Sequence, residues 1–323
     1  MKILVIHTYG LGDMVMATPA LRVLSRHVPK ARIDLLVFQK FSAAPVEACG
    51  ENINVLYGSF DIFKLMGTIM RLRRNRYDYM LHTSGTDTLK MALFMALLKG
   101  DVRIAEVQRQ WIPWYRYPLR GNHAIHRVEA NLRLIAPIVG EELSGPECKP
   151  HFCLEPSERK YAEDFLSKNG LVDKRLIGIH PGCNEKFSYK RWEVEKYIDL
   201  VGRMYDRLEG AEILLFAGPD ERKEADILKE RYPALVVVRE NLNRVAALIS
   251  HLSLMITNDS GLGHIASCFE VKTVTIFSGS SRADPHKIAP YTMHSCVVDF
   301  RKEKCDDEVS YVMETVDRCW SER

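Results

Sequence analysis

One short segment near the start of the chain places a carboxylate directly after two glycines, in Gly10-Leu11-Gly12-Asp13. Glycines let another molecule approach the backbone closely. A carboxylate in such a loop can accept a proton from a substrate hydroxyl, so Asp13 is a candidate general base. The alternative is that Asp13 only caps the helix that follows. The motif alone leaves both interpretations open.

Two later segments carry groups that could hold an anion. His180-Pro181-Gly182 ends an apolar run, and Lys190 follows it within Lys190-Arg191-Trp192. Further on, two glycines open a helix, where free backbone amides lie beside the positive end of the helix dipole. We therefore predict an anion site at this helix start. Its residues are Asp259, Ser260, Gly261, Gly263 and His264.

A third loop, Ala217-Gly218-Pro219-Asp220-Glu221, offers two carboxylates suited to ribose hydroxyls, although a plain turn before a helix would have the same composition. Together these loops are typical of a site for a nucleotide diphosphate. The chain contains no Asp-x-Asp pair that could hold a metal-bridged diphosphate. We therefore expect no metal and no cofactor, and expect Lys190 and the amides after Asp259 to neutralise the leaving group.

The elements that position these loops are predicted from alternating apolar runs and helix-like stretches. In the first half, strands are expected at 1–6, 32–38, 78–82 and 102–105. After a segment rich in Ser, Gly, Pro and Glu at 143–156, strands are expected at 176–180, 212–217, 235–238, 254–257 and 273–277. The pattern predicts an α/β protein with two Rossmann-like doubly wound domains facing a central cleft, with ligands beyond the carboxyl ends of the strands.

Other functional classes fit the sequence less well. Gly10-x-Gly12 invites a nicotinamide or flavin interpretation, but Val15 occupies the third glycine position and Asp34 lies inside its strand rather than at its end. With 323 residues, 46% hydrophobic and 27% charged, the chain is long enough for two cores, and its apolar runs are too short to span a bilayer. The first residues lack the features of a signal peptide, so we expect a cytoplasmic protein.

Eight cysteines occur without a CxxC pair, and we expect them to be mostly buried thiols rather than a disulfide framework. The group most similar to a metal site is Cys148, His151 and Cys153. It lacks a recognisable fourth ligand, so metal binding is not expected.

Positive charge is concentrated in residues 1–150, which hold 20 Lys and Arg against 13 Asp and Glu. Within 101–133, arginines such as Arg116 and Arg120 alternate with Trp and Tyr. Single-stranded nucleic acid can bind such a segment, and a phosphorylated glycolipid with an apolar anchor suits it as well. The third interpretation is a loop that packs its aromatic side chains on the core.

The motifs together resemble one family. KILVIHTYGLGDMVMATPAL, IGIHPG with KRW, FAGPDE and NDSGLGHIASCFEVKTVTIFSGS occur in the order and approximate spacing of the glycosyltransferase family 9 heptosyltransferases. The resemblance implies a GT-B fold and inverting, metal-independent transfer of heptose, with Asp13 as base and Lys190 as the diphosphate-binding lysine. The candidate donor-binding residues are Gly12, His180, Gly182, Lys190, Asp220, Glu221, Asp259, Ser260, Gly261, Gly263 and His264.

The resemblance also implies the partners: an ADP-heptose donor, a lipopolysaccharide inner-core acceptor received near Arg116 and Arg120, peripheral contact with the inner membrane, and no nucleic acid. We accordingly expect an acceptor-binding domain at 1–155, a nucleotide-sugar-binding domain at 156–305 and a closing helix at 306–323. The alternatives are a transferase that uses another nucleotide sugar, a GT-B nucleotide-sugar epimerase, and a non-catalytic nucleotide-sugar-binding module.

Overall fold

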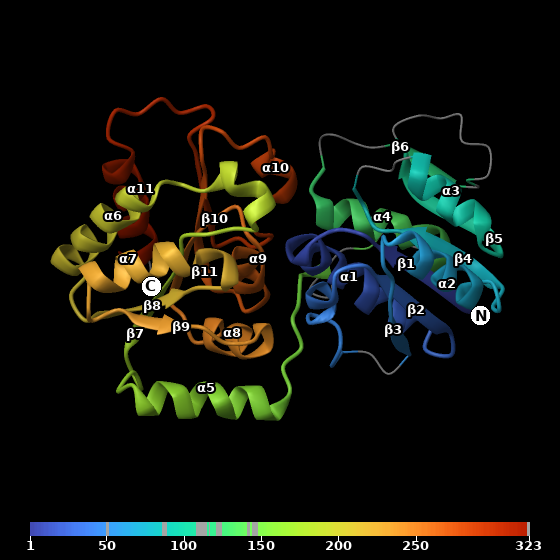
Figure 1. Cartoon of the computed structure of the whole chain (residues 1–323), viewed down its shortest axis with the longest axis horizontal. Coiled ribbons are helices and arrows are strands. Elements are labelled where there is room, and N and C mark those ends of the chain that lie inside the picture. Colours follow the sequence, from blue (N-terminus) through green and yellow to red (C-terminus); the bar gives the residue numbers. More distant parts are fainter. Residues whose placement is uncertain are drawn as a thin grey trace. The chain divides into compact units, whose positions relative to one another are not determined.

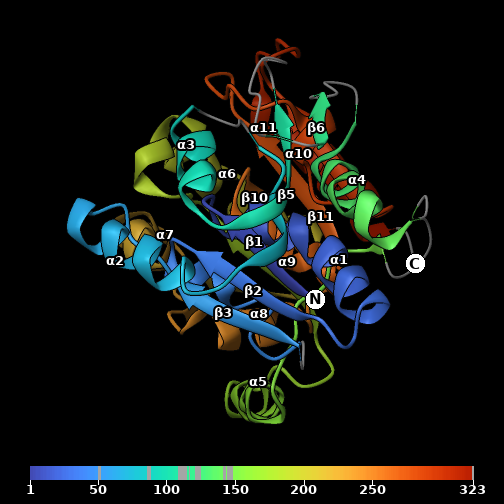
Figure 2. The ribbon, with the colours of Figure 1, turned by 90° about the vertical axis from the view of Figure 1, so that its right-hand side faces the viewer.

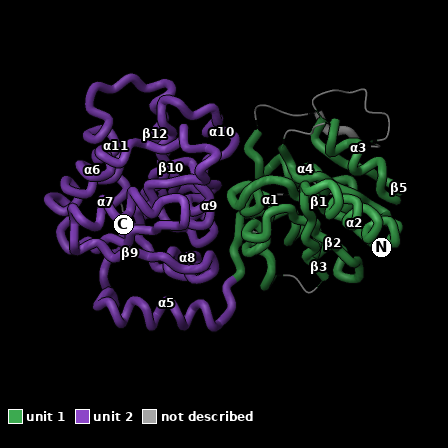
Figure 3. Tube along the Cα trace, in the orientation of Figure 1, with its two compact units in different colours: residues 1–153 green, residues 154–323 purple. Residues whose placement is uncertain are grey.

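The structure is a computed structural model that describes residues 1–49, 52–85, 89–107, 115, 117–120, 125–140, 143 and 148–321, with the backbone alone for 117–120. Two compact units divide the chain, Met1–Cys153 and Leu154–Arg323 (Figure 3). No helix in these ranges is both long and apolar enough to cross a membrane.

The N-terminal unit is built on a parallel sheet. Its strands are β1 (Lys2–His7), β2 (Arg32–Val37), β3 (Ile53–Tyr57), β4 (Tyr77–His82), β5 (Gly100–Val107) and β6 (Tyr117–Arg120). Their order is β3-β2-β1-β4-β5-β6. The buried runs of β1 and β2 are covered on both faces, which explains why they are mostly apolar, with Asp34 and His7 as buried polar exceptions.

Four helices cover the two faces of this sheet. They are α1 (Leu11–His27), α2 (Ile62–Leu72), α3 (Leu89–Leu97) and α4 (Arg127–Val139). Figure 2 shows α2 and α3 on one face and α1 with α4 on the other. The α2 and α3 face packs on alternate strand residues such as Leu4, Ile6 and Met80. A short 3₁₀ helix, η1 (Lys40–Ala43), follows β2.

The C-terminal unit repeats this plan (Figure 1). Its strands are β7 (Arg175–His180), β8 (Ala211–Phe216), β9 (Val236–Val238), β10 (Leu254–Asn258), β11 (Lys272–Phe277) and β12 (Ser295–Asp299). They form a parallel sheet in the order β12-β11-β10-β7-β8-β9. The expected architecture of two doubly wound sheets is therefore confirmed.

The helices of this unit lie before, between and after the strands. They are α5 (Pro156–Lys168), η3 (Glu185–Lys190), α6 (Val194–Arg207), η4 (Pro219–Glu221), α7 (Arg222–Arg231), α8 (Leu242–Ile249), α9 (Gly261–Cys268), α10 (Pro285–Ile288) and α11 (Glu308–Ser321). α5 ends just before Gly170, which has φ +67°, a left-handed conformation that glycine adopts readily. The final helix, α11, packs against α6, and Val309, Val312 and Met313 enter the core.

Candidate active site

Three neighbouring strands of the C-terminal unit bring the predicted donor residues to one edge of its sheet. β10, β7 and β8 run parallel and pair in that order, so their carboxyl ends lie side by side. His180 ends β7, the Asp220 loop follows β8, and Asp259 follows β10. This edge is where doubly wound sheets bind ligands.

Lys190 and Asp259 form an ion pair across this edge. Lys190 Nζ lies 2.7 Å from Asp259 Oδ2, and the two side chains are 19% and 7% exposed. Burial acts to lower the pKa of Lys190, while the Asp259 carboxylate raises it, and the net shift is upward. Lys190 therefore remains charged at neutral pH, as a phosphate-binding lysine must.

Asn258 joins the loops around this pair. Its Oδ1 accepts hydrogen bonds from Trp192 N and Tyr197 Oη, each at 3.1 Å, and its Nδ2 donates to Pro181 O at 2.7 Å. The residue is fully buried. Sequence reasoning treated Asn258 only as the end of a strand. A polar amide at the end of an otherwise apolar run was the signal that could have identified it.

The two carboxylates after β8 have different environments. Glu221 is buried, its Oε2 accepts a hydrogen bond from Gly218 N at 3.0 Å, and burial raises its pKa. A Cβ at Gly182 would lie only 1.8 Å from Glu221 Cγ. The Glu221 side chain therefore packs where any other residue at position 182 would place its own. Asp220 is exposed, and its Oδ2 accepts from Glu185 N at 3.2 Å. Asp220 is thus the accessible carboxylate, and Glu221 holds the loop.

The predicted anion site opens α9. Ser260 is the N-cap, yet its side chain makes no capping hydrogen bond and instead lies 2.8 Å from Thr257 Oγ1. The backbone amides of the first turn are thus not used by the cap residue. Gly263 packs closely on Thr257, because a Cβ there would meet Thr257 Cγ2 at 3.0 Å, and His264 is buried behind it.

His180 is an internal residue. It is 6% exposed, its Nδ1 lies 3.1 Å from Phe216 O, and burial lowers its pKa to about 4. The imidazole is therefore neutral at physiological pH. These contacts suit a group that supports the loops from beneath rather than one that neutralises phosphate.

In the N-terminal unit, Gly12 and Asp13 belong to the first turn of α1, and Gly10 is the N-cap. The interpretation of Asp13 as the capping residue is therefore wrong. Its carboxylate still lies near the positive end of the helix dipole, which favours the ionised form that a base needs. The side chain is half-buried, as a group reached by a substrate hydroxyl would be.

Buried polar groups support the loop that precedes Asp13. His7 Nδ1 lies 3.0 Å from Thr83 Oγ1, and its Nε2 lies 3.2 Å from Gly10 O. Burial lowers the pKa of His7 to about 4 and that of His82 to about 3. The Tyr9 ring stacks on His82 with centroids 5.6 Å apart. The sequence did not single out these residues, since polar side chains at the ends of two strands show no spacing that indicates a shared site.

A further polar cluster lies beyond β4 and β5. Ser84 Oγ donates to Glu106 Oε2 at 2.6 Å and accepts from Arg127 Nη1 at 3.2 Å. Asn131 Oδ1 accepts from Ser84 N at 2.8 Å. Among the described residues, the buried Nε of Arg127 has no hydrogen-bond partner.

The predicted acceptor residues are only partly covered by the structure. Arg116 lies outside the described residues, and Arg120 ends β6 with its side chain outside them as well. Of the aromatic residues in this segment, Tyr115 is buried in the core of the unit and its hydroxyl contacts Met95 Sδ at 3.7 Å. For Tyr115, the packing interpretation therefore holds.

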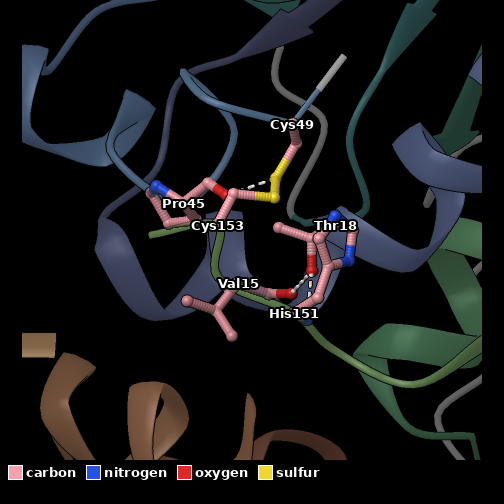
Figure 4. The surroundings of a disulfide bond; sticks show 6 residues. All are labelled: Val15, Thr18, Pro45, Cys49, His151 and Cys153. Carbon is pink, nitrogen blue, oxygen red and sulfur yellow. Dashed lines mark hydrogen bonds between the residues drawn. A yellow bond between two sulfur atoms is a disulfide. The ribbon is translucent and has the colours of Figure 1, made fainter. Parts of the chain in front are cut away.

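Six of the eight cysteines are thiols, as expected for most of them. Cys49 and Cys153 form a disulfide, which we did not expect (Figure 4). Cys49, rather than Cys148, is the residue that lies with His151 and Cys153, and the three ligand-type atoms fall within 4.8 Å of one another. Because the two sulfurs are bonded to each other, neither is a thiolate ligand in this state.

Thr18 of α1 anchors the same segment. His151 N donates to Thr18 Oγ1 at 3.0 Å, and Thr18 Oγ1 donates to Val15 O at 2.7 Å. Figure 4 shows these hydrogen bonds beside the disulfide. The end of the N-terminal unit is therefore attached both to the segment after η1 and to the helix that carries Asp13.

Two doubly wound parallel sheets in tandem are the architecture of the GT-B fold. The profile of glycosyltransferase family 9 (heptosyltransferase) matches residues 66–315. The chain belongs to this family, and it is an enzyme that transfers a glycosyl group. The family resemblance seen in the motifs is confirmed.

Similar proteins agree with this assignment. Lipopolysaccharide heptosyltransferase 3 of Escherichia coli is 27% identical over 290 residues, which cover 83% of this chain and 81% of that protein. The glycosyltransferase family 9 structure from Veillonella parvula DSM 2008 superposes with a TM-score of 0.82 at 18% identity, covering 100% of this chain and 97% of that one. E. coli heptosyltransferase WaaC with ADP gives a TM-score of 0.74 at 20% identity, covering 99% and 100%. At these identities the two structures show a shared fold.

Proposed function

We propose that the enzyme transfers heptose from ADP-heptose to the inner core of lipopolysaccharide, with inversion and without a metal. The observation that carries the proposal is the Lys190–Asp259 pair beside the first turn of α9. In this arrangement a charged lysine and a helix N-terminus lie together, and both can bind the negative charge of a departing diphosphate. The heptose and the glycolipid acceptor are those that the family and its relatives' names suggest.

In the proposed reaction, an acceptor hydroxyl attacks the anomeric carbon of the donor. Asp13 takes the hydroxyl proton as the new carbon–oxygen bond forms, and the bond between the anomeric carbon and the phosphate oxygen breaks on the opposite face. ADP leaves with its charge balanced by Lys190 and the amides at Gly261 to Gly263. The mechanism requires the two units to bring Asp13 and the donor together.

The residues around the ends of β7 and β8 have separate places in this proposal. Asp220, the accessible carboxylate after β8, accepts hydrogen bonds from the ribose hydroxyls. Glu221, Gly182 and His180 shape the loops from within, as their burial and contacts suit. On the acceptor side, Arg116 and Arg120 receive anionic groups of the glycolipid. The enzyme works on the cytoplasmic side of the inner membrane, in peripheral contact with it, and without nucleic acid.

The test is incubation with ADP-heptose and a set of truncated core glycolipids, followed by mass measurement. A gain of one heptose on one acceptor supports the proposal. Donor alone distinguishes the other functions, because an epimerase converts the nucleotide sugar without acceptor, whereas a transferase releases ADP faster when acceptor is added. Loss of turnover in EDTA that magnesium restores would refute the metal-free mechanism.

A further inference from the structure

Helix α2 exposes large apolar side chains along one side. Ile62, Phe63, Met66 and Met70 are 64%, 85%, 53% and 59% exposed. Met66 and Met70 follow Ile62 by four and eight residues and follow Phe63 by three and seven. These spacings place the four side chains on one side of the helix. Phe60, just before the helix, is 64% exposed.

The opposite side of α2 is already buried. Thr68, Ile69 and Leu72 are the buried residues of the helix, and Ile69 and Leu72 belong to the core under the sheet. Asp61 caps the helix, its Oδ1 accepting a hydrogen bond from Lys64 N at 3.1 Å. The inner side of α2 therefore attaches the helix to the core, while its outer side leaves large apolar side chains exposed.

Helix α3 continues this apolar exposure. Leu89, Leu93 and Leu97 recur every four residues and are 55%, 49% and 51% exposed. Both helices pack into the same core cluster, and Phe38 joins them, with its ring 4.4 Å from that of Phe60 and 6.2 Å from that of Phe94. Figures 1 and 2 both show α2 and α3 as neighbours. We call the eight exposed residues, Phe60, Ile62, Phe63, Met66, Met70, Leu89, Leu93 and Leu97, the α2/α3 apolar surface.

Cations accompany this surface almost without acids. In 60–75 and 89–99, the exposed charged residues are Lys64, Arg71, Arg73, Arg74, Lys90 and Lys99, together with the acid Asp61. The Asp61 carboxylate is already used in the helix cap. Large apolar side chains beside lysine and arginine are typical of surfaces that lie on anionic lipid.

We propose that the α2/α3 apolar surface docks the enzyme onto an anionic membrane surface. Phe63 and its apolar neighbours enter the boundary between lipid headgroups and acyl chains, and the cations contact lipid phosphates. The inference rests on the proposed function in that its acceptor is anchored in a membrane. It identifies which face of the N-terminal unit makes that contact.

Charge favours lipid over a second copy of the chain. In a symmetric dimer the same patch would face itself, which would bring the cations of both copies together. Anionic lipid instead complements them. An exposed apolar patch of this kind needs a partner, and a lipid surface matches both of its chemical components.

The test uses the full-length protein and sedimentation with vesicles of phosphatidylethanolamine containing about one third phosphatidylglycerol. Wild type should bind these vesicles, bind neutral vesicles more weakly, and dissociate partly at high salt. Phe63→Ser with Met66→Ser should lower the partition coefficient by about 100-fold, since each of the two large apolar side chains contributes about tenfold when buried. Arg73→Gln with Arg74→Gln should weaken binding to anionic vesicles alone.

The matched control is Val172→Ser with Met293→Ser in the C-terminal unit. These side chains are 54% and 93% exposed, comparable to 53% for Met66 and 85% for Phe63. It should bind vesicles as wild type does. Unchanged binding by Phe63→Ser/Met66→Ser, with an unchanged melting temperature, would overturn the inference. So would loss of a dimer in that variant, measured by sedimentation velocity, because the surface would then be an interface between copies.

Activity separates this inference from the proposed function. The apolar variant should retain wild-type turnover on a detergent-free, delipidated core oligosaccharide and show a raised KM for the same acceptor embedded in vesicles. Vesicle binding needs no turnover, so it would still be measured if heptose transfer failed. Equal KM values for the embedded acceptor in both proteins would contradict a docking role.

Discussion

Lys190 Nζ lies 2.7 Å from Asp259 Oδ2, although the two residues are 69 positions apart in the chain. The lysine reaches the site from η3, and the aspartate follows β10. The cation that is proposed to meet the donor diphosphate is therefore held in place before the donor arrives. Such preorganisation lowers the free energy of ordering the side chain when substrate binds.

Lys190→Ala tests this pair. We expect the Kd for ADP to rise about 10- to 100-fold, because a charge-assisted contact to phosphate is lost. The variant also leaves the buried Asp259 unpaired, which should lower the free energy of unfolding by about 1–3 kcal/mol. The measurements are calorimetric ADP binding and urea unfolding.

The double variant Lys190→Ala/Asp259→Asn separates the two effects. Neutralising Asp259 should restore most of the lost stability without restoring ADP affinity. If ADP affinity returned with stability, the lysine would act only by holding the loop together.

Asp13→Asn should lower turnover by about 10²- to 10⁴-fold with little change in donor Kd, because the amide cannot accept the acceptor proton. The matched control is Asp61→Asn, which changes an acid at the start of another helix of the same unit. Asn caps helices as well as Asp, so this control should be fully active. Near-wild-type turnover of Asp13→Asn would remove Asp13 from the chemical step.

The two carboxylates after β8 should respond differently to alanine. Asp220→Ala should raise the donor KM about 3- to 30-fold with an unchanged melting temperature, since each hydrogen bond to ribose contributes about 1 kcal/mol. Glu221→Ala should instead lower the melting temperature by about 2–6 °C, because Gly218 N loses a buried acceptor and Arg191 loses the carboxylate 3.8 Å from its Nη2. The reverse pattern would exchange the two roles.

Replacing Arg116 and Arg120 together by Gln should raise the acceptor KM and leave the donor Kd unchanged. Added salt should reproduce part of the defect in wild type, because partly exposed charges are screened over about 8–10 Å. Arg159 and Lys160, exposed on α5, provide the control pair. A lower melting temperature with an unaltered acceptor KM would show that the segment only packs on the core.

Three buried histidines predict that acid destabilises the fold. Burial lowers the pKa of His7, His82 and His180 to about 4, 3 and 4, below the ordinary value of 6.5. Below pH 6.5 the unfolded chain therefore binds more protons than the folded protein. The contribution of these neutral histidines to stability is complete above pH 6.5 and falls as the pH drops toward their pKa values in the folded protein.

Between pH 6.5 and 5, each of these histidines should lower the free energy of unfolding by about 2 kcal/mol. Urea unfolding at pH 7.5, 6.5 and 5.0 measures the effect. His251→Gln, which changes an exposed histidine, should leave the profile unaltered. A flat profile would contradict neutral buried imidazoles.

The inner strands of both sheets could be predicted from sequence, because most of their residues are buried and each contains a short run of mostly apolar side chains. β3, β6 and β12 were missed. Each lies at the edge of its sheet, and the described side chains of β3 are half-buried or exposed, so no such run marks it. β6 also contains Pro118, which weakens a strand pattern.

The candidate site was predictable as separate loops and not as a set of contacts. Lys190 and Asp259 were each selected by their local motifs, yet their pairing depends on the order β10-β7-β8, which periodicity does not determine. Asn258 was missed for the same reason, since its partners lie on loops far away in sequence. Which side chains meet across these loops depends on the order of the strands in the sheet, and the local spacing of residues says little about that order.

The Cys49–Cys153 bond makes the chain between those residues a closed covalent ring. It encloses β3 to β6 and α2 to α4, and the sequence separation of its ends is 104 residues. A single backbone cut anywhere inside the ring would leave the protein as one molecule on a non-reducing gel. Reduction would then release two fragments, one of which carries Asp13 and the other the whole donor-side unit.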